Sequence, residues 1–135
     1  MKREILFRGL ARDGKWYYGD LLWNDMGCRI VYVENIPPSW QEPGGDTKSI
    51  YQDVNFETIG EFSGLKDKNN QGIFEGDIVK YYGIDFGEMI CTVDFDCCSF
   101  VIKNDNMLHT PLGNAKRDYI EVIGNVYEHP NLIEQ

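Results

Sequence analysis

The sequence predicts an all-β protein, and three observations lead to this prediction. Apolar and polar residues alternate with a period of two along several stretches, as in strands that bury one face. Aromatic residues make up 13% of the chain, which also contains 14 glycines, and this composition suits pleated faces joined by tight turns. Helical periodicity is nearly absent, and we expect at most a short helical turn at NLIEQ (131–135).

Three strands are predicted in the first part of the chain. REILFRGLA (3–11) alternates, DGK (13–15) is a turn signal, and the aromatic stretch WYYGDLLW (16–23) follows. Strand and turn chemistry agree here, so these residues predict a β-hairpin. CRIVYVEN (28–35) is the third predicted strand.

A long loop is predicted at IPPSWQEPGGDTKS (36–49), which carries three of the five prolines and a Gly-Gly pair. Proline removes ladder donors, so this stretch cannot lie inside a sheet. Loops of this length are either functional or disordered. Trp40 is the candidate partner contact in it, because a tryptophan in a loop can anchor an interface. The alternative, in which Trp40 folds back over the edge of the core, is the more common arrangement and stays open.

The middle of the chain is predicted to be extended as well. Residues 50–63 place Val54, Phe56 and Ile59 inward. Residues 64–77 contain two short predicted strands around KNNQG, where Asn and Gly accept the left-handed backbone angles of a tight reversal.

The stretch FEGDIVKYY contains an acid pair, Glu75 and Asp77, with two interpretations. In the first, Gly76 allows a turn and Asp77 accepts backbone N–H bonds across it before the next strand begins. In the second, the carboxylates perform acid–base catalysis or hold a cation. General acid–base catalysis also needs a pocket and a matched pKa, and no His or Lys stands at a suggestive spacing. We therefore favour the turn.

The last part of the chain again alternates. GEMICTVDFD (87–96) places Asp94 and Asp96 on the solvent face, SFVIKN (99–104) runs back beside it, and DYIEVIGNVYEHP (118–130) is the final predicted strand. The predicted inward set of the first of these is Met89, Cys91, Val93 and Phe95. The final strand places Ile120, Val122 and Val126 on one face and Glu121, Ile123 and Asn125 on the other.

The net charge of −9 argues against sequence-independent nucleic-acid binding, which depends on cationic groups that release counterions. No apolar run approaches the roughly 20 residues that cross a bilayer. The start, MKREILFRGLARDGK, shows no signal-peptide apolar block. We expect a cytoplasmic protein with no membrane association, in which the cysteines are reduced.

The residues that commonly build metal or nucleophilic sites are poorly arranged for either. The cysteines are spaced C-x5-C-C with Cys28 far upstream, unlike zinc knuckles, and His109 and His129 are expected in different loops. Asp94 and Asp96 make the surroundings of Cys97 negative, which disfavours a thiolate nucleophile. A hydrolase that holds Mg²⁺ through these two aspartates is the weakest alternative.

No nucleophile elbow, phosphate-binding loop or dinucleotide-binding turn is present either. We therefore predict no enzyme activity, no catalytic residues, no metal and no cofactor.

Three stretches together resemble the YopX family of phage and prophage proteins. They are MKREILFRGLARDGKWYYGDLL, ETIGEFSGLKDKNNQGIFEGDIVKY and YIEVIGNVYEHPNLI, and they follow the family's order. Asn70 departs from the pattern, since it stands where the family usually has a turn glycine; asparagine also accepts left-handed angles.

The resemblance implies an N-terminal antiparallel β module over residues 1–60, with the loop 36–49, and a C-terminal SH3-like β barrel over 61–135, packed as one unit. The family has no established activity, so no site residue is carried over.

We expect a non-catalytic interaction protein that binds a host or phage macromolecule, because no catalytic constellation is found in a small, acidic, all-β chain. The partner is an unknown protein or, through an edge strand, a second copy of the chain. The alternative is nucleic-acid binding by the C-terminal barrel, with Tyr81, Tyr82 and Phe86 stacking on bases. The same aromatic residues serve equally well in a core.

Overall fold

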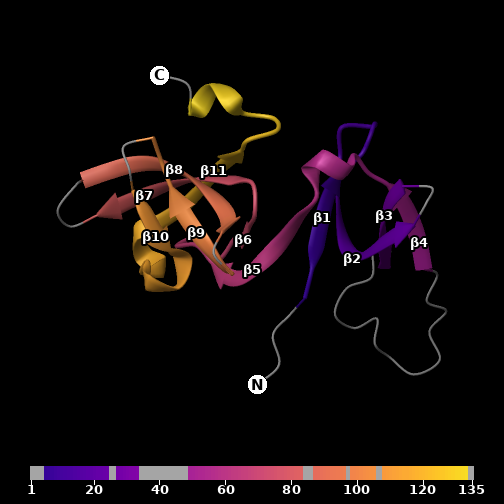
Figure 1. The fold of residues 1–135 in the computed structure, drawn as a ribbon, viewed down its shortest axis with the longest axis horizontal. Coiled ribbons are helices and arrows are strands. Elements are labelled where there is room, and N and C mark those ends of the chain that lie inside the picture. Colours follow the sequence, from indigo (N-terminus) through magenta and orange to yellow (C-terminus); the bar gives the residue numbers. More distant parts are fainter. Residues whose placement is uncertain are drawn as a thin grey trace. The chain divides into compact units, whose positions relative to one another are not determined.

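The protein is all-β, as the sequence predicts, in the computed structural model shown in Figure 1. The structure describes residues 5–24, 27–33, 49–83, 87–96, 98–105 and 108–133. Within these ranges the helical residues form only short 3-10 turns, one of which, η5 (Pro130–Leu132), overlaps the predicted turn. One compact unit comprises Ile5–Glu61, and a second begins at Phe62.

Antiparallel strands in the order β4-β3-β2-β1 build the N-terminal unit (Figure 1). The predicted hairpin is confirmed, since Leu10 pairs with Trp16 and the Asp13 carboxylate accepts a hydrogen bond from the Lys15 amide at 2.8 Å. β1 also pairs with the first residues of β5. The strands are β1 (Phe7–Leu10), β2 (Trp16–Asn24), β3 (Gly27–Val33), β4 (Ser49–Asp53) and β5 (Gly60–Lys66).

The segment after β4 turns instead of staying extended, so the expectation that Phe56 points inward is wrong. Asn55 caps the 3-10 turn η2 (Phe56–Thr58), and its backbone N–H donates to the Leu10 carbonyl at 2.9 Å. The Thr58 hydroxyl accepts a hydrogen bond from the Leu10 N–H at 2.9 Å, so Thr58 is the buried residue of the turn. Because this anchored turn directs Thr58 inward, Phe56, two residues earlier, is left 60% exposed.

A five-stranded antiparallel sheet, in the order β10-β9-β8-β7-β11, forms most of the second unit (Figure 1). The short strand β6 pairs with the end of β5. The elements are β6 (Gly72–Phe74), β7 (Asp77–Gly83), β8 (Gly87–Asp96), β9 (Ser99–Lys103), β10 (His109–Pro111), η3 (Leu112–Asn114), η4 (Arg117–Tyr119) and β11 (Ile120–Asn125).

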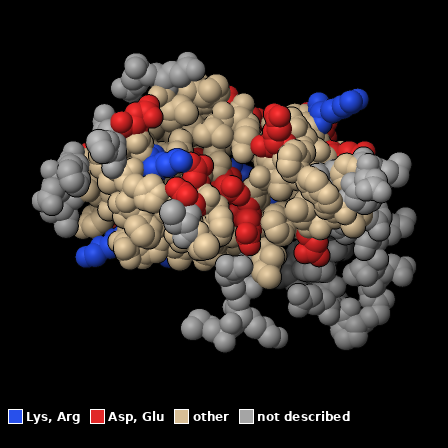
Figure 2. Space-filling model, in the orientation of Figure 1, with Lys and Arg blue, Asp and Glu red and all other residues tan. Residues whose placement is uncertain are grey.

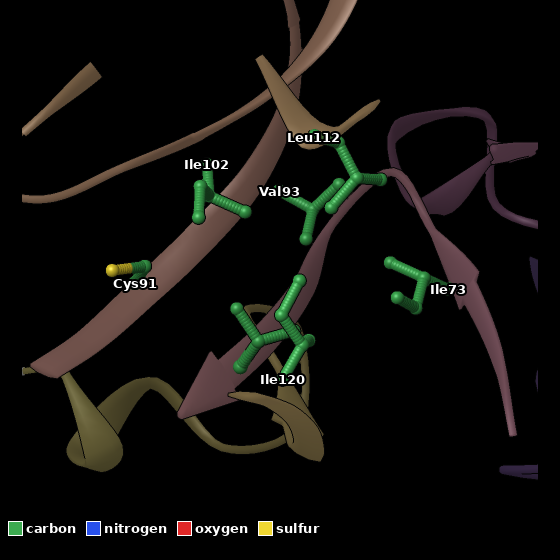
Figure 3. Packing of buried hydrophobic residues seen from close by; sticks show 7 residues of the cluster. Ile73, Cys91, Val93, Ile102, Leu112 and Ile120 are labelled. Carbon is green, nitrogen blue, oxygen red and sulfur yellow. The ribbon is translucent and has the colours of Figure 1, made fainter. Parts of the chain in front are cut away.

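The core of the second unit gathers side chains from strands far apart in the sequence, as Figure 3 shows. Cys91 and Val93 of β8 are buried, as predicted for these two members of the inward set, and burial raises the pKa of the Cys91 thiol to about 11. A thiol with so high a pKa is an inert core group, as the sequence predicts for this cysteine. The cluster consists of Ile73, Val79, Cys91, Val93, Ile102, Leu112 and Ile120.

Three expectations for this unit need correction. Phe95 lies at the hairpin end of β8 and is 53% exposed, although its alternation predicts burial. A bulge in β11 between Val122 and Gly124 shifts the register, so Asn125 is buried as Ile120 is, although the pattern places these two residues on opposite faces. His109 begins β10 and does not lie in a loop.

Candidate functional site

The acid pair that raised the question of catalysis belongs to a turn. Gly76 has φ +93°, and Asp77 is buried with its Oδ2 accepting a hydrogen bond from the Phe74 N–H at 2.8 Å. The Gly76 amide donates to the Val93 carbonyl at 2.8 Å. The carboxylate of Asp77 therefore closes the β6–β7 turn, as the favoured interpretation predicts.

A second buried carboxylate, that of Asp67, organises the β5–β6 reversal. The sequence pattern gave no sign of this role. Asp67 is fully buried, and its Oδ1 accepts hydrogen bonds from the amides of Asn69 and Gln71, both at 2.9 Å. Its Oδ2 accepts a third, from the Val122 N–H of β11, at 2.8 Å. Asn70 has φ +66° at this reversal, as its left-handed tolerance predicts. Asp67 thus joins a turn to a strand that follows it by about 50 residues in the sequence.

The aspartates of β8 face solvent, as predicted, and each has a partner in the neighbouring strands. Asp94 forms an ion pair with Lys103 at 2.8 Å, and Asp96 lies 3.3 Å from the Nε2 of His109. In the part of the chain that the structure describes, no group of three or more His, Cys, Asp or Glu residues is placed to hold a metal ion.

Two of the three aromatic residues proposed for base stacking, Tyr81 and Tyr82, are described, and their surroundings differ. Tyr81 packs against the core, whereas Tyr82 is 53% exposed and lies 6.2 Å from the ring of Tyr119. Phe86 and the candidate partner contact Trp40 lie outside the described residues.

The N-terminal unit contains an open groove with a volume of about 870 Å³, which we call the turn groove. The β1–β2 turn, the start of β3 and the end of β4 form it. These elements lie close together because the amide of Asn55 is hydrogen-bonded to the carbonyl of Leu10. The lining residues are Leu10, Ala11, Arg12, Asp13, Gly27, Gln52, Asp53, Val54 and Asn55.

Two large exposed aromatic side chains belong to the segments from which the lining of the turn groove also comes, although neither is itself a lining residue. Trp23 is 62% exposed, and its ring meets that of Phe56 edge-to-face, with the centroids 4.9 Å apart. Trp23 pairs across the hairpin with the residue that follows Gly27, and Phe56 directly follows Asn55. Exposed large aromatic residues that gather on a surface are typical of interaction sites. The sequence predicts a strand at Trp23 and burial at Phe56, so it contains no local signal for this pair.

The residues that line the turn groove carry charges of both signs. Asp13 and Asp53 are exposed carboxylates, against one guanidinium from Arg12. Hydrogen bonds from the Tyr17 hydroxyl and the Lys15 amide hold the pKa of the Asp13 carboxyl below its usual value, so it remains ionised at neutral pH. Figure 2 shows more acidic than basic side chains on the face that it draws, in keeping with the net charge of −9.

This chain matches one family model and resembles a solved structure. A family model, that of the YopX protein, matches residues 6–134. The chain belongs to the YopX family. The crystal structure of protein EF1440 from Enterococcus faecalis is similar, with a TM-score of 0.60 and 22% sequence identity over 98% of this chain and 100% of that one. This likeness supports the all-β fold, and among curated proteins no match was found.

In this YopX family member, the stretches that carry the resemblance build turns. Gly76 of the middle stretch bonds through its carbonyl to the amide of Val126 in the last stretch, at 2.9 Å. A Cβ at Gly76 would lie 2.9 Å from the ring of Tyr127, so the two stretches require each other's shape. Within the described ranges, no helix has the length and apolar character needed to cross a bilayer.

Proposed function

We propose that this protein is a non-catalytic interaction module, encoded by a phage or prophage, that binds a host or phage macromolecule in the bacterial cytoplasm. The observation that carries the proposal is the exposed Trp23–Phe56 pair on the surface of the N-terminal unit. Truncating a buried interface aromatic typically removes about 2 kcal/mol or more of binding energy, and such residues cluster in a few positions. Support also comes from Asp67 and Asp77, because their buried carboxylates accept backbone hydrogen bonds at turns and so have a structural role.

The family origin and the finer architecture belong to the same proposal. The five-stranded order of the second unit, with β5 and β6 beside it, suits the SH3-like barrel that the family resemblance implies. Small β modules commonly bind partners through loops and sheet edges. The N-terminal unit carries such a surface, and we assign partner binding to it.

Replacing both Trp23 and Phe56 by alanine is expected to lower the capture of the specific partner from host lysate by about tenfold or more, because both rings would be buried in the complex. Quantitative mass spectrometry of captured proteins, with wild-type protein as the reference, measures this loss. Phe95→Ala removes an equally exposed aromatic from the other unit and is the matched control. Equal recovery of all partners by the wild-type protein and the double variant would contradict the proposal.

A second function, nucleic-acid binding by the C-terminal unit, is favoured by one observation, the exposed Tyr82–Tyr119 pair. Stacking of a base on an aromatic ring contributes about 1–3 kcal/mol. If this function holds, labelled single-stranded DNA or RNA binds at low salt, weakens as salt rises, and loses affinity about tenfold or more on Tyr82→Ala. The absence of any polarisation change at low salt would exclude it.

A further inference from the structure

We propose that the reversal between β5 and β6 is a clasp that closes the outer edge of β11, and that opening it exposes this edge to strand pairing with a second copy of the chain. Among the strands that the structure describes, β11 pairs with β7 alone, so its other edge ends the five-stranded sheet. The clasp, residues 67–71, is bonded to that edge. This inference concerns the C-terminal unit and goes beyond the proposed function, which rests on the N-terminal unit.

The strand β11 has the composition of a strand that pairs readily with other strands. Its sequence, IEVIGN, has three β-branched residues and one charge, that of Glu121. Open edges of such strands are templates for edge-to-edge association, which proteins prevent by covering them or by placing charges and prolines there. The opposite end of the sheet shows one such device, because β10 is short and ends at Pro111, which has no N–H to donate. The strand β11 contains no proline, so another segment has to cover it.

The clasp offers β11 the two bonds that a partner strand would offer. The amide of Lys68 donates to the carbonyl of Ile120 at 3.0 Å, and the Val122 N–H donates to Oδ2 of Asp67 at 2.8 Å. In an antiparallel ladder this carbonyl and this N–H would bond to the backbone of the next strand. The carboxylate of Asp67 thus replaces a strand carbonyl, and an incoming strand can pair here only after the clasp has left.

Side chains hold the clasp in place from outside. Arg117 donates from Nε to the carbonyl of Asp67 at 2.8 Å and from Nη2 to Oδ1 of Asn70 at 2.9 Å. Lys68 forms an ion pair with Glu121 at 3.2 Å, and both side chains are partly exposed. Exposed polar contacts of this kind are individually weak, so the clasp can open locally while the core of the unit stays folded.

The far end of β11 is closed by a different segment. Nδ1 of His129 accepts a hydrogen bond from the amide of Asn125 at 3.2 Å. A Cβ at Gly124 would lie 2.8 Å from that ring nitrogen and 3.0 Å from Cδ1 of Leu132. The C-terminal residues therefore leave no room for a second strand at this end, and pairing is confined to the part of β11 that the clasp covers.

The test uses the full chain with the double variant Asp67→Asn/Arg117→Ala. Asparagine keeps an acceptor oxygen for the amides of the turn, but its NH2 group cannot accept the bond from Val122. Sedimentation velocity over a concentration series is expected to show association that exceeds that of the wild-type chain and rises with concentration. Amide hydrogen exchange, followed by NMR, is expected to be about tenfold or more faster at Lys68 and Val122 in the dilute variant, and to slow at Val122 as the variant associates.

A matched control is Lys116→Ala/Asp118→Ala, which removes one cation and one carboxylate from exposed positions on either side of Arg117. It is expected to leave association and the exchange of Val122 within about twofold of the wild type. If the double variant does not fold, Asp67→Asn alone removes the same bond to Val122 and is expected to change exchange and association in the same directions, by smaller amounts.

Two results would overturn the inference. Exchange that speeds up equally at Val93 of the core would show that the reversal does not open by itself. Association equal to that of the wild type, with Val122 unprotected at every concentration, would show that the open edge does not pair with a second copy.

Discussion

Replacing Asp67 by alanine is expected to destabilise the C-terminal unit by about 3 kcal/mol or more. Its carboxylate accepts hydrogen bonds from the amides of Asn69, Gln71 and Val122. A donor left without a partner in a buried setting costs about 1–3 kcal/mol, and alanine strands three of them together. Water that enters the small space left behind offsets part of this cost, which is why the lower end of the sum is expected.

Urea unfolding followed by NMR signals of core residues such as Val93 measures the loss. Asp118→Ala is the control, since it removes an exposed carboxylate from the same unit. The urea midpoint of Asp67→Asn is expected to lie between those of Asp67→Ala and Asp118→Ala, because asparagine has one acceptor oxygen where the carboxylate has two. A midpoint for Asp67→Ala equal to that of Asp118→Ala would show that the carboxylate does not hold the turn to β11.

Gly9→Ala is expected to destabilise the N-terminal unit by about 2 kcal/mol, through overpacking rather than backbone strain. A Cβ at this position would lie 2.6 Å from Cγ2 and 2.7 Å from Cβ of Val54. The β-branched side chain cannot swing away, and its backbone is held because the next residue, Asn55, bonds to Leu10. Neither partner can therefore relieve the clash without breaking a contact between β1 and the segment after β4.

A double-mutant cycle with Val54→Ala tests the cause. The two substitutions together are expected to cost at least about 1 kcal/mol less than the sum of the single costs, since the smaller side chain makes room for the new methyl group. Gly113→Ala is the control, because a Cβ there meets nothing within 4 Å. Unfolding costs that add within error would show that Val54 is not what excludes a side chain at Gly9.

The strands and the tight reversals follow from local chemistry and were predictable. Alternation located the strands, and residues suited to left-handed angles marked the turns at Asn70 and Gly76. The closing role of Asp77 was predictable too, because its hydrogen bond reaches only three residues back. The stretches that carry the YopX resemblance contain these turns, so the resemblance and the local chemistry led to the same prediction.

Two of the errors have a physical origin that the local sequence pattern does not contain. Phe56 was expected inside because alternation was extended through a segment that Asn55 and Thr58 anchor as a turn on Leu10. Asn125 was placed on the face opposite to Ile120 because a bulge does not show in a period-two pattern. Such anchoring hydrogen bonds depend on which strands become neighbours, and spacing along the chain does not report that.

The amino acids alone thus determined the all-β class, the turns and the family, because period-two burial and turn preferences act within a few residues. Only the tertiary structure decided that Asp67 would hold a distant strand and that Trp23 and Phe56 would meet at the surface. Those arrangements arise when separate segments compete for the same buried space, and the residues that find no room inside become the surface available to a partner.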